Sequence, residues 1–317
     1  MPINKVLIIA DPAVDLYMNL PELQKMQIAS ASPESDLFAG GTGGNTAGAL
    51  AKIGNAVALM GAVGADAFGK FFKNDLEKIG VDISQIVEVE NSFTLLCTVA
   101  VTQSRDRYFT IYPAVGYAAG LLDGSHRKDD HLSGISWLHA SGSCLSELPA
   151  RLTLLESMQE ASKKGIPISL DLNLRPRNDQ MPEDYQKAIE DAIGYADFVL
   201  GSAEEEFHPL TGIAAPEIAA RNISDGKRTV ISRLGEKGSL AVAPNGEVVF
   251  AEAFSVKVFD TLGAGDVYDA GFIAACLQDK PIHEALQWGN ALAALSISKK
   301  GAYRFLNRSD FLNILHT

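Results

Sequence analysis

The chain has 317 residues, of which 47% are hydrophobic and 21% are charged, and its formal net charge is −12. This negative charge argues against binding of a nucleic-acid backbone by bulk electrostatics, and no stretch approaches the roughly 20 apolar residues of a membrane-spanning helix. The three cysteines, Cys97, Cys144 and Cys276, fit neither a zinc pattern nor a disulfide framework, and with no targeting signal the cytoplasm is the expected compartment.

Short apolar runs rich in β-branched residues alternate with helical patterns along the chain. Strands are predicted at residues 6–10, 56–60, 135–139, 166–171, 198–201 and 229–233, and helices at residues 45–53, 68–79, 151–163, 182–193 and 216–222. This alternation predicts an α/β fold whose parallel sheet is connected by right-handed helical crossovers. Ligands of such sheets bind beyond the carboxyl ends of the strands.

Two segments interrupt the alternation, at about residues 12–38 and 87–112. Both contain strand-like patterns without helices between them, and residues 94–102 and 108–112 look like antiparallel neighbours. We interpret the two segments as a small separate sheet inserted in the larger domain.

A turn of small residues, Asp260-Thr-Leu-Gly-Ala-Gly-Asp266, leads into an apolar helix. The N–H groups of Gly263, Ala264 and Gly265 would face outward from the first helical turn, where the helix dipole also favours an anion. Asp266 lies beside that site. A carboxylate is repelled by phosphate but is a suitable base for an attacking hydroxyl. The alternative is that Asp266 only caps the helix.

A second glycine turn, Gly40-Gly-Thr-Gly-Gly-Asn45, also leads into a helix, which Gly54 is expected to end. Gly40 and Gly41 permit close approach of a ligand, and the Asn45 amide can hydrogen-bond to hydroxyl groups. The alternative is a tight turn capped by Asn45. The motif is not a Walker loop, because no Gly-Lys-Ser/Thr follows, and it does not directly follow the first strand as a dinucleotide fingerprint does.

The two motifs, in this order and near these positions, resemble the signatures of the ribokinase-like (phosphofructokinase-B type) carbohydrate kinases, and the resemblance covers essentially the whole chain. It implies one kinase domain over residues 1–317, with a three-layer α/β/α fold and a small β-sheet lid over the sugar. It also implies ATP and Mg²⁺ as cofactors and a small-molecule sugar as substrate, without nucleic-acid or membrane partners. The lid of many members forms a dimer contact, so a homodimer through the lid is an expectation.

The resemblance also assigns roles around the sugar and the transferred phosphoryl group. The implied base and anion hole are Asp266, Gly263, Ala264 and Gly265. The implied sugar contacts are Asp15, Gly40, Gly41 and Asn45. The alternative for Asp15 is a solvated loop carboxylate.

Further roles follow by resemblance on the nucleotide and metal side. The implied ATP contacts are Ser232, Gly235, Gly238 and Asn290, with an ordinary hairpin turn as the alternative for residues 235–238. Glu205 would help to hold magnesium, usually through water. The alternative is that Glu205 is only a charged residue at the start of a helix. Ser202 stands where the family usually has asparagine. A potassium ion would be bound by the Asp260 side chain and by carbonyls near Leu262, Ser296, Lys299 and Gly301. Leu262 stands where the family more often has threonine. We expect this difference to have little effect on the anion hole, because its backbone donors do not depend on that side chain.

Asp171, Asn173 and Arg175 alternate at the end of a buried strand, and a period of two predicts that they share one face. They resemble the Asp-x-Asn-x-Arg stretch of fructokinases and 2-keto-3-deoxygluconate kinases. Arg105 and Arg107 resemble the lid arginines of sugar-acid kinases, the alternative being a solvated hairpin turn. An arginine at either place can pair with a sugar carboxylate or a phosphate.

We therefore rank 2-keto-3-deoxygluconate first as the substrate, phosphorylated on its terminal hydroxymethyl group, and fructose second. A nucleoside ranks third, because Phe109 or Tyr112 could stack on its base. A non-catalytic sugar-binding regulator of the same fold is the alternative outside enzymes, and the complete Asp260–Asp266 motif argues against it.

Overall fold

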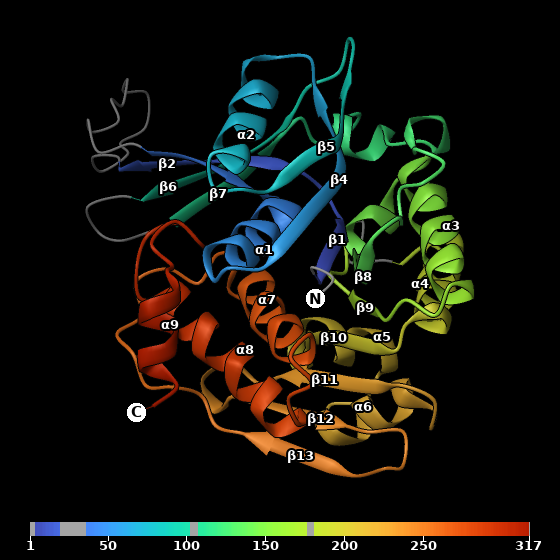
Figure 1. Cartoon of the computed structure of the whole chain (residues 1–317), viewed down its shortest axis with the longest axis vertical. Helices are drawn as coiled ribbons and strands as arrows, with labels where there is room; N and C mark the ends of the chain where they lie inside the picture. The colour runs from blue at the N-terminus through green and yellow to red at the C-terminus, as the bar shows by residue number, and fades with distance from the viewer. Residues whose placement is uncertain (1–3, 20–35, 102–106, 176–180, 317) are drawn as a thin grey trace.

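The computed structural model describes residues 4–19, 36–101, 107–175 and 181–316 (Figure 1). Their strands are β1 (Lys5–Ile9), β2 (Ala13–Asn19), β3 (Asp36–Gly40), β4 (Ala56–Gly64), β5 (Asp82–Val89), β6 (Leu95–Val101), β7 (Arg107–Tyr112), β8 (Ile135–Ser141), β9 (Ile168–Asp171), β10 (Phe198–Ser202), β11 (Thr229–Arg233), β12 (Ser239–Val242) and β13 (Val248–Ala251). Their α-helices are α1 (Gly41–Lys52), α2 (Ala67–Glu77), α3 (Ala150–Lys163), α4 (Glu183–Tyr195), α5 (His208–Thr211), α6 (Pro216–Ser224), α7 (Ala264–Cys276), α8 (Ile282–Ile297) and α9 (Arg308–Ile314). None of these described helices has the length and apolarity that crossing a lipid bilayer requires.

Nine of the described strands form one large sheet, in the order β13-β12-β11-β10-β9-β8-β1-β4-β5. Neighbouring strands from β5 to β11 are parallel, and β12 and β13 continue the sheet as antiparallel strands. The predicted α/β fold with a parallel sheet is confirmed.

The central strand β1 shows why helices cover both faces of the large sheet. Leu7 and Ile9 share a core with residues of α3, α4 and α6, whereas Val6 and Ile8 share a core with residues of α1, α2, α7 and α8. Successive side chains of a strand point to opposite faces, so a continuously apolar strand needs cover on both. The result is a three-layer α/β/α arrangement (Figure 1).

Four strands form the second sheet, which we call the lid sheet, in the order β3-β2-β6-β7. β2 is parallel to β6, and β3 and β7 are antiparallel to their neighbours. The lid sheet extends to one side of the large sheet, at the left of Figure 1. β5 continues to Val89 inside the large sheet, so the lid strands of the second interrupting segment begin later than residue 87.

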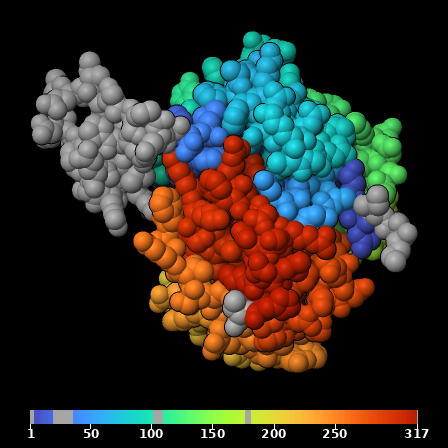
Figure 2. All heavy atoms as spheres, turned by 60° about the vertical axis from the view of Figure 1, so that its left-hand side comes forward, coloured from blue at the N-terminus to red at the C-terminus, as the bar shows by residue number. Residues whose placement is uncertain are grey.

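The start of α1 and the end of the chain lie close to the lid sheet. α1 begins at Gly41, earlier than the predicted residue 45. Figure 2 shows the C-terminal residues, in red, lying against residues of α1 and α2, in blue and cyan. Arg304 forms an ion pair of 3.3 Å with Asp75 of α2, which ties the loop after α8 to this part of the molecule.

Candidate active site

Asp266 lies in the first turn of α7 and is 8% exposed. The Asn45 amide, in α1, donates a hydrogen bond of 2.8 Å to Asp266 Oδ2, so the two glycine motifs meet at this carboxyl group. Burial, as the largest cause, raises the pKa of Asp266 to about 8. The cap of α7 is Gly263, and the helix has no side-chain cap bond. This geometry argues against the interpretation of Asp266 as a helix cap.

The turn before α7 requires glycine at Gly263. Its φ is 72°, and a Cβ atom there would lie 2.6 Å from Asn45 Nδ2 and 2.7 Å from Ala302 Cβ. The Ala264 N–H donates to the Thr261 carbonyl at 3.2 Å, so one of the three predicted anion-hole donors is already used within the turn. Gly263 and Gly265 are the remaining predicted donors at this helix start, where N–H groups lack intrahelical partners.

Asp15 of β2 is also buried, with 6% of its surface exposed. Burial first, and the charge of Asp260 second, raise the pKa of Asp15 to about 7. A Cβ atom on Gly40 would lie 2.0 Å from Asp15 Oδ2, and one on Gly41, at φ 69°, would lie 2.5 Å from the Asp11 carbonyl. The glycines therefore let β2 approach the junction of β3 and α1, and α1 carries Asn45, which reaches Asp266.

Sequence reasoning missed Asp11 in this group. Ser143, after β8, donates a hydrogen bond of 2.5 Å to Asp11 Oδ1, and Thr42 of α1 donates to the same oxygen. Asp11 thus joins three segments at the carboxyl end of the sheet. The sequence feature that could have indicated Asp11 is its position four residues before Asp15, in the short loop that follows the first strand.

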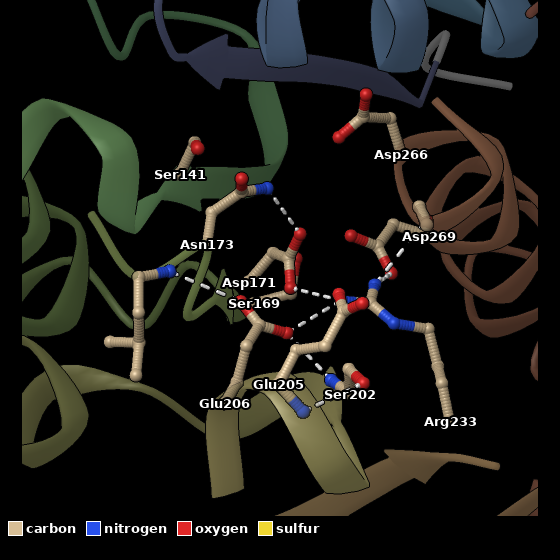
Figure 3. A network of polar contacts seen from close by, with 12 residues as sticks. Ser141, Ser169, Asp171, Asn173, Ser202, Glu205, Glu206, Arg233, Asp266 and Asp269 are labelled. Atoms are coloured by element: carbon tan, nitrogen blue, oxygen red, sulfur yellow. Dashed lines mark hydrogen bonds and ion pairs between the residues drawn. The ribbon is translucent and has the colours of Figure 1, made fainter. Parts of the chain in front are cut away.

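Arg233, the last residue of β11, was not predicted, and it is the centre of a buried polar network (Figure 3). Its Nη2 lies 2.7 Å from Asp171 Oδ1 and 3.1 Å from Glu206 Oε2, and its Nη1 lies 2.8 Å from Asp269 Oδ1. Nη1 also donates to the Gly265 carbonyl at 3.3 Å. One guanidinium group therefore holds three carboxyl groups and the predicted catalytic turn, by which we mean residues 260–266.

The predicted magnesium residue Glu205 is exposed, whereas its neighbour Glu206 points into the network. The segment Ala203–Phe207 is a π-helical turn. Glu206 accepts hydrogen bonds from the Ser202 N–H at 2.6 Å and the Leu174 N–H at 3.1 Å, and the Ser202 hydroxyl accepts one from the Glu205 N–H at 3.3 Å. Among the described residues, no group of three or more histidine, cysteine, aspartate or glutamate side chains is arranged to hold a metal.

The prediction that Asp171, Asn173 and Arg175 share one face is wrong, because β9 ends at Asp171 and Asn173 has φ 39°. Asn173 turns back and donates to Asp171 Oδ2 at 2.7 Å. Arg175 is exposed and donates to the carbonyls of Asn173 and Leu174. Arg105 lies outside the described residues, as does the side chain of Arg107, whose backbone begins β7 opposite Val101.

The predicted nucleotide contacts gather around β11, β12 and α8. Gly235 and Gly238 lie in the turn between two antiparallel strands, and a Cβ atom on Gly238 would lie 2.1 Å from the Ala251 carbonyl. The Asn290 amide donates to the carbonyls of Ala251 and Glu252 at 3.0 and 3.1 Å. Ser232 is fully buried in β11. Asn290 therefore holds the loop after β13 on α8.

The predicted potassium residues lie in the turn before α7, in the last turn of α8 and in the loop after α8. The N–H groups of Phe259 and Asp260 both donate to the Ile297 carbonyl. The Leu262 N–H donates to Asp260 Oδ1 at 3.2 Å. Two of the predicted carbonyl ligands already accept backbone hydrogen bonds, Ser296 from the Lys299 N–H and Gly301 from the Arg304 N–H.

The sequence profile of the pfkB family carbohydrate kinases matches residues 4–308. The chain is 28% identical over 309 residues to a 5-dehydro-2-deoxygluconokinase of Clostridium perfringens, covering 94% of this chain and 86% of that protein. It is 30% identical over 295 residues to a ribokinase of Haemophilus influenzae, covering 91% and 90%. An Escherichia coli ribokinase II candidate, solved with ATP and Mg²⁺, superposes with a TM-score of 0.85 at 23% identity and 99% coverage of both chains.

Proposed function

The chain belongs to the pfkB family of carbohydrate kinases, and from that premise we propose that it transfers the γ-phosphoryl group of ATP to the terminal hydroxymethyl group of a sugar acid of the 2-keto-3-deoxygluconate type. The observation that carries the proposal is the buried Asp266 carboxyl group, held by Asn45 at the start of α7. A carboxylate there can take the proton of an attacking hydroxyl group. The N–H groups of Gly263 and Gly265 would stabilise negative charge on the transferred phosphoryl group.

ATP and Mg²⁺ enter the proposal through the family and the ATP-bound neighbour. Mg²⁺ at a kinase site usually keeps several waters and binds mainly to substrate phosphates, with one or two carboxylates. The described residues fit that arrangement, because Asp171 is the last residue of β9 and Glu205 is an exposed residue of the turn that follows β10. Mg²⁺ would neutralise charge on the phosphates, and Asp171 and Glu205 would hold it through water.

A sugar acid is favoured over fructose by the similarity to one relative, and the charges of the site constrain how a sugar acid would bind. The relative named above is a 5-dehydro-2-deoxygluconokinase, whose substrate name is that of a sugar acid. The described side of the sugar site holds the carboxyl groups of Asp11, Asp15 and Asp266, each of which repels a carboxylate when it is ionised. A sugar acid would therefore direct its own carboxylate away from them. We propose that Arg107 of the lid sheet receives it.

This substrate assignment predicts a selective effect of Arg107→Ala. Loss of a charge-assisted pair costs roughly 1.5–3 kcal/mol in binding, so kcat/KM for 2-keto-3-deoxygluconate should fall by about one to two orders of magnitude, while kcat/KM for fructose stays unchanged. The measurement is ATP consumption with pooled sugars, sugar acids and nucleosides, followed by kinetics on each active compound. If fructose is the better substrate of the wild type and Arg107→Ala changes kcat/KM for neither compound, the substrate is a ketose and not a sugar acid.

We also propose a potassium ion beside the catalytic turn, bound by Asp260 and neighbouring carbonyls. Such a cation would steady the turn that carries Gly263 and Gly265. The expected result is higher kcat in potassium than in sodium at equal ionic strength. Equal rates in the two salts across a wide concentration range would contradict this proposal.

A homodimer through the lid sheet remains a prediction. Phe109 and Ile111 share one face of β7 and Tyr112 lies on the other, and all three are exposed large apolar side chains of the kind found at protein contacts. Tyr112 also lies 6.0 Å from Phe93, measured between ring centroids.

A further inference from the structure

A tyrosine hydroxyl group connects the lid sheet to the catalytic turn. Tyr17 of β2 donates a hydrogen bond of 2.6 Å to Oδ2 of Asp260, the first residue of the turn. Tyr17 is 4% exposed and Asp260 is 6% exposed, so water competes little for this bond. Hydrogen bonds to a carboxylate are short and are stronger than bonds between neutral groups.

An apolar contact surrounds this bond. Tyr17, Phe38 and Val99 of the lid sheet form a buried cluster, and Leu262 of the catalytic turn packs against it. The rings of Tyr17 and Phe38 meet edge to face, with centroids 5.5 Å apart. The expectation that Leu262 has little effect therefore overlooked its side chain, which contacts the lid.

The loop after α8 reaches the same place. Lys300 Nζ lies 5.5 Å from the Tyr17 ring centroid and 2.9 Å from Asp36 Oδ2 at the start of β3. A Cβ atom on Gly301 would lie 3.2 Å from the Phe38 ring. We call Tyr17, Phe38, Val99, Asp260, Leu262 and Lys300 the lid–turn contact.

β2 connects this contact to the sugar site. Asp15 and Tyr17 are two residues apart on one strand, so they lie on the same face of the lid sheet. Cys97 and Val99 are their partners in β6. A displacement of β2 at Asp15 therefore moves the Tyr17 hydroxyl relative to Asp260. Opening of the lid sheet must break the Tyr17–Asp260 bond and expose Leu262.

We propose that Tyr17 is a positioning residue that couples the lid sheet to the catalytic turn, so that the turn holds its position for phosphoryl transfer only while β2 is in place. The coupling to sugar rests on the proposed function, because Asp15 is a sugar contact only there. Tyr17 itself touches neither reacting group. Its effect passes through Asp260 to the N–H groups of Gly263 and Gly265.

Tyr17→Phe removes the hydroxyl group and keeps the ring, so the apolar contact survives. We expect kcat for sugar phosphorylation to fall roughly tenfold, with KM for ATP unchanged. Leu262→Ala weakens the same contact and should act in the same direction. Because the two residues are in one contact, the double variant should lose less than the product of the two single losses.

The matched control is Tyr268→Phe. Tyr268 is a buried tyrosine whose hydroxyl donates 2.8 Å to Ser239, away from the lid sheet. If each hydroxyl group serves only stability, its loss should lower the melting temperature of both variants and leave kcat unchanged under conditions in which the protein is folded. Unchanged kcat in folded Tyr17→Phe overturns the proposal.

Hydrogen exchange without any sugar separates this inference from the proposed function. Amides of residues 259–266 should exchange faster in Tyr17→Phe than in the wild type, while those of β8 and β9 keep their protection. Equal exchange at residues 259–266 in the two proteins overturns the coupling. If exchange changes but the wild type phosphorylates no sugar acid or ketose, only the proposed function fails.

Discussion

Asp266→Asn should lower kcat by roughly 10²–10⁴-fold, which is the usual cost of losing a general base, while ATP and sugar still bind. The structure supports a clean test, because the asparagine oxygen can still accept the Asn45 hydrogen bond that now reaches Asp266 Oδ2 at 2.8 Å. The shape of the site is kept, and only the ability to take a proton is lost. Steady-state kinetics and calorimetric binding of a non-hydrolysable ATP analogue measure the two effects separately.

The pH dependence of kcat/KM gives a second test of the role of Asp266. Burial raises the pKa of Asp266 to about 8, and a base acts only when it is deprotonated. Wild-type kcat/KM should therefore fall as the pH decreases through about 8, and the residual activity of Asp266→Asn should lack that dependence. Asp279→Asn, an exposed change beyond the end of α7, is the matched control and should behave as the wild type. A folded Asp266→Asn protein with near wild-type kcat would remove Asp266 from the mechanism.

The sequence predicted those parts of the site in which local backbone geometry leaves a signature. A turn that needs φ 72° and no Cβ atom at Gly263 selects glycine, and a glycine turn before an apolar helix is visible in the sequence. The strands of the parallel sheet were predictable for a similar reason, because burial on both faces produces continuous apolar runs.

The parts that were missed depend on contacts between distant segments. Arg233 follows an apolar strand with no local signal, and its carboxylate partners come from β9, α7 and the turn after β10. The error at Arg175 arose because a period of two holds only while the strand continues, and β9 stops at Asp171. Glu206 was missed for the same reason as Arg233, because the groups that it contacts, the Ser202 and Leu174 N–H groups and Arg233, come from separate segments.

The network around Arg233 predicts the largest effect on stability. The Arg233 side chain is 14% exposed, and the side chains of Asp171 and Asp269 are at most 2% exposed. Removing one partner of a buried ion pair leaves uncompensated charge and costs about 3–5 kcal/mol. We therefore expect Arg233→Met to lower the free energy of unfolding by about 3–5 kcal/mol, as measured by urea denaturation at pH 8.

The loss should depend on pH in a defined direction. Burial is the main cause that raises the pKa of Glu206 and of Asp269, and Arg233 opposes it. Without Arg233 these folded-state pKa values rise further above the unfolded values. Stability of the variant is then retained at low pH, where the carboxyl groups are protonated, and is lost as the pH rises through the folded-state values. The deficit relative to the wild type should be larger at pH 8 than at pH 5.

Two further variants decide whether charge balance is the cause. Arg233→Met combined with Asp269→Asn removes one of the uncompensated carboxylates and should recover part of the lost stability, because the two side chains interact directly at 2.8 Å. Arg221→Met is the matched control. Its ion pair with Glu217 is 42% and 51% exposed, and surface pairs contribute about 0–1 kcal/mol. If Arg233→Met costs no more than Arg221→Met, or if Asp269→Asn adds a second loss in place of a recovery, Arg233 does not hold this part of the site together by its charge.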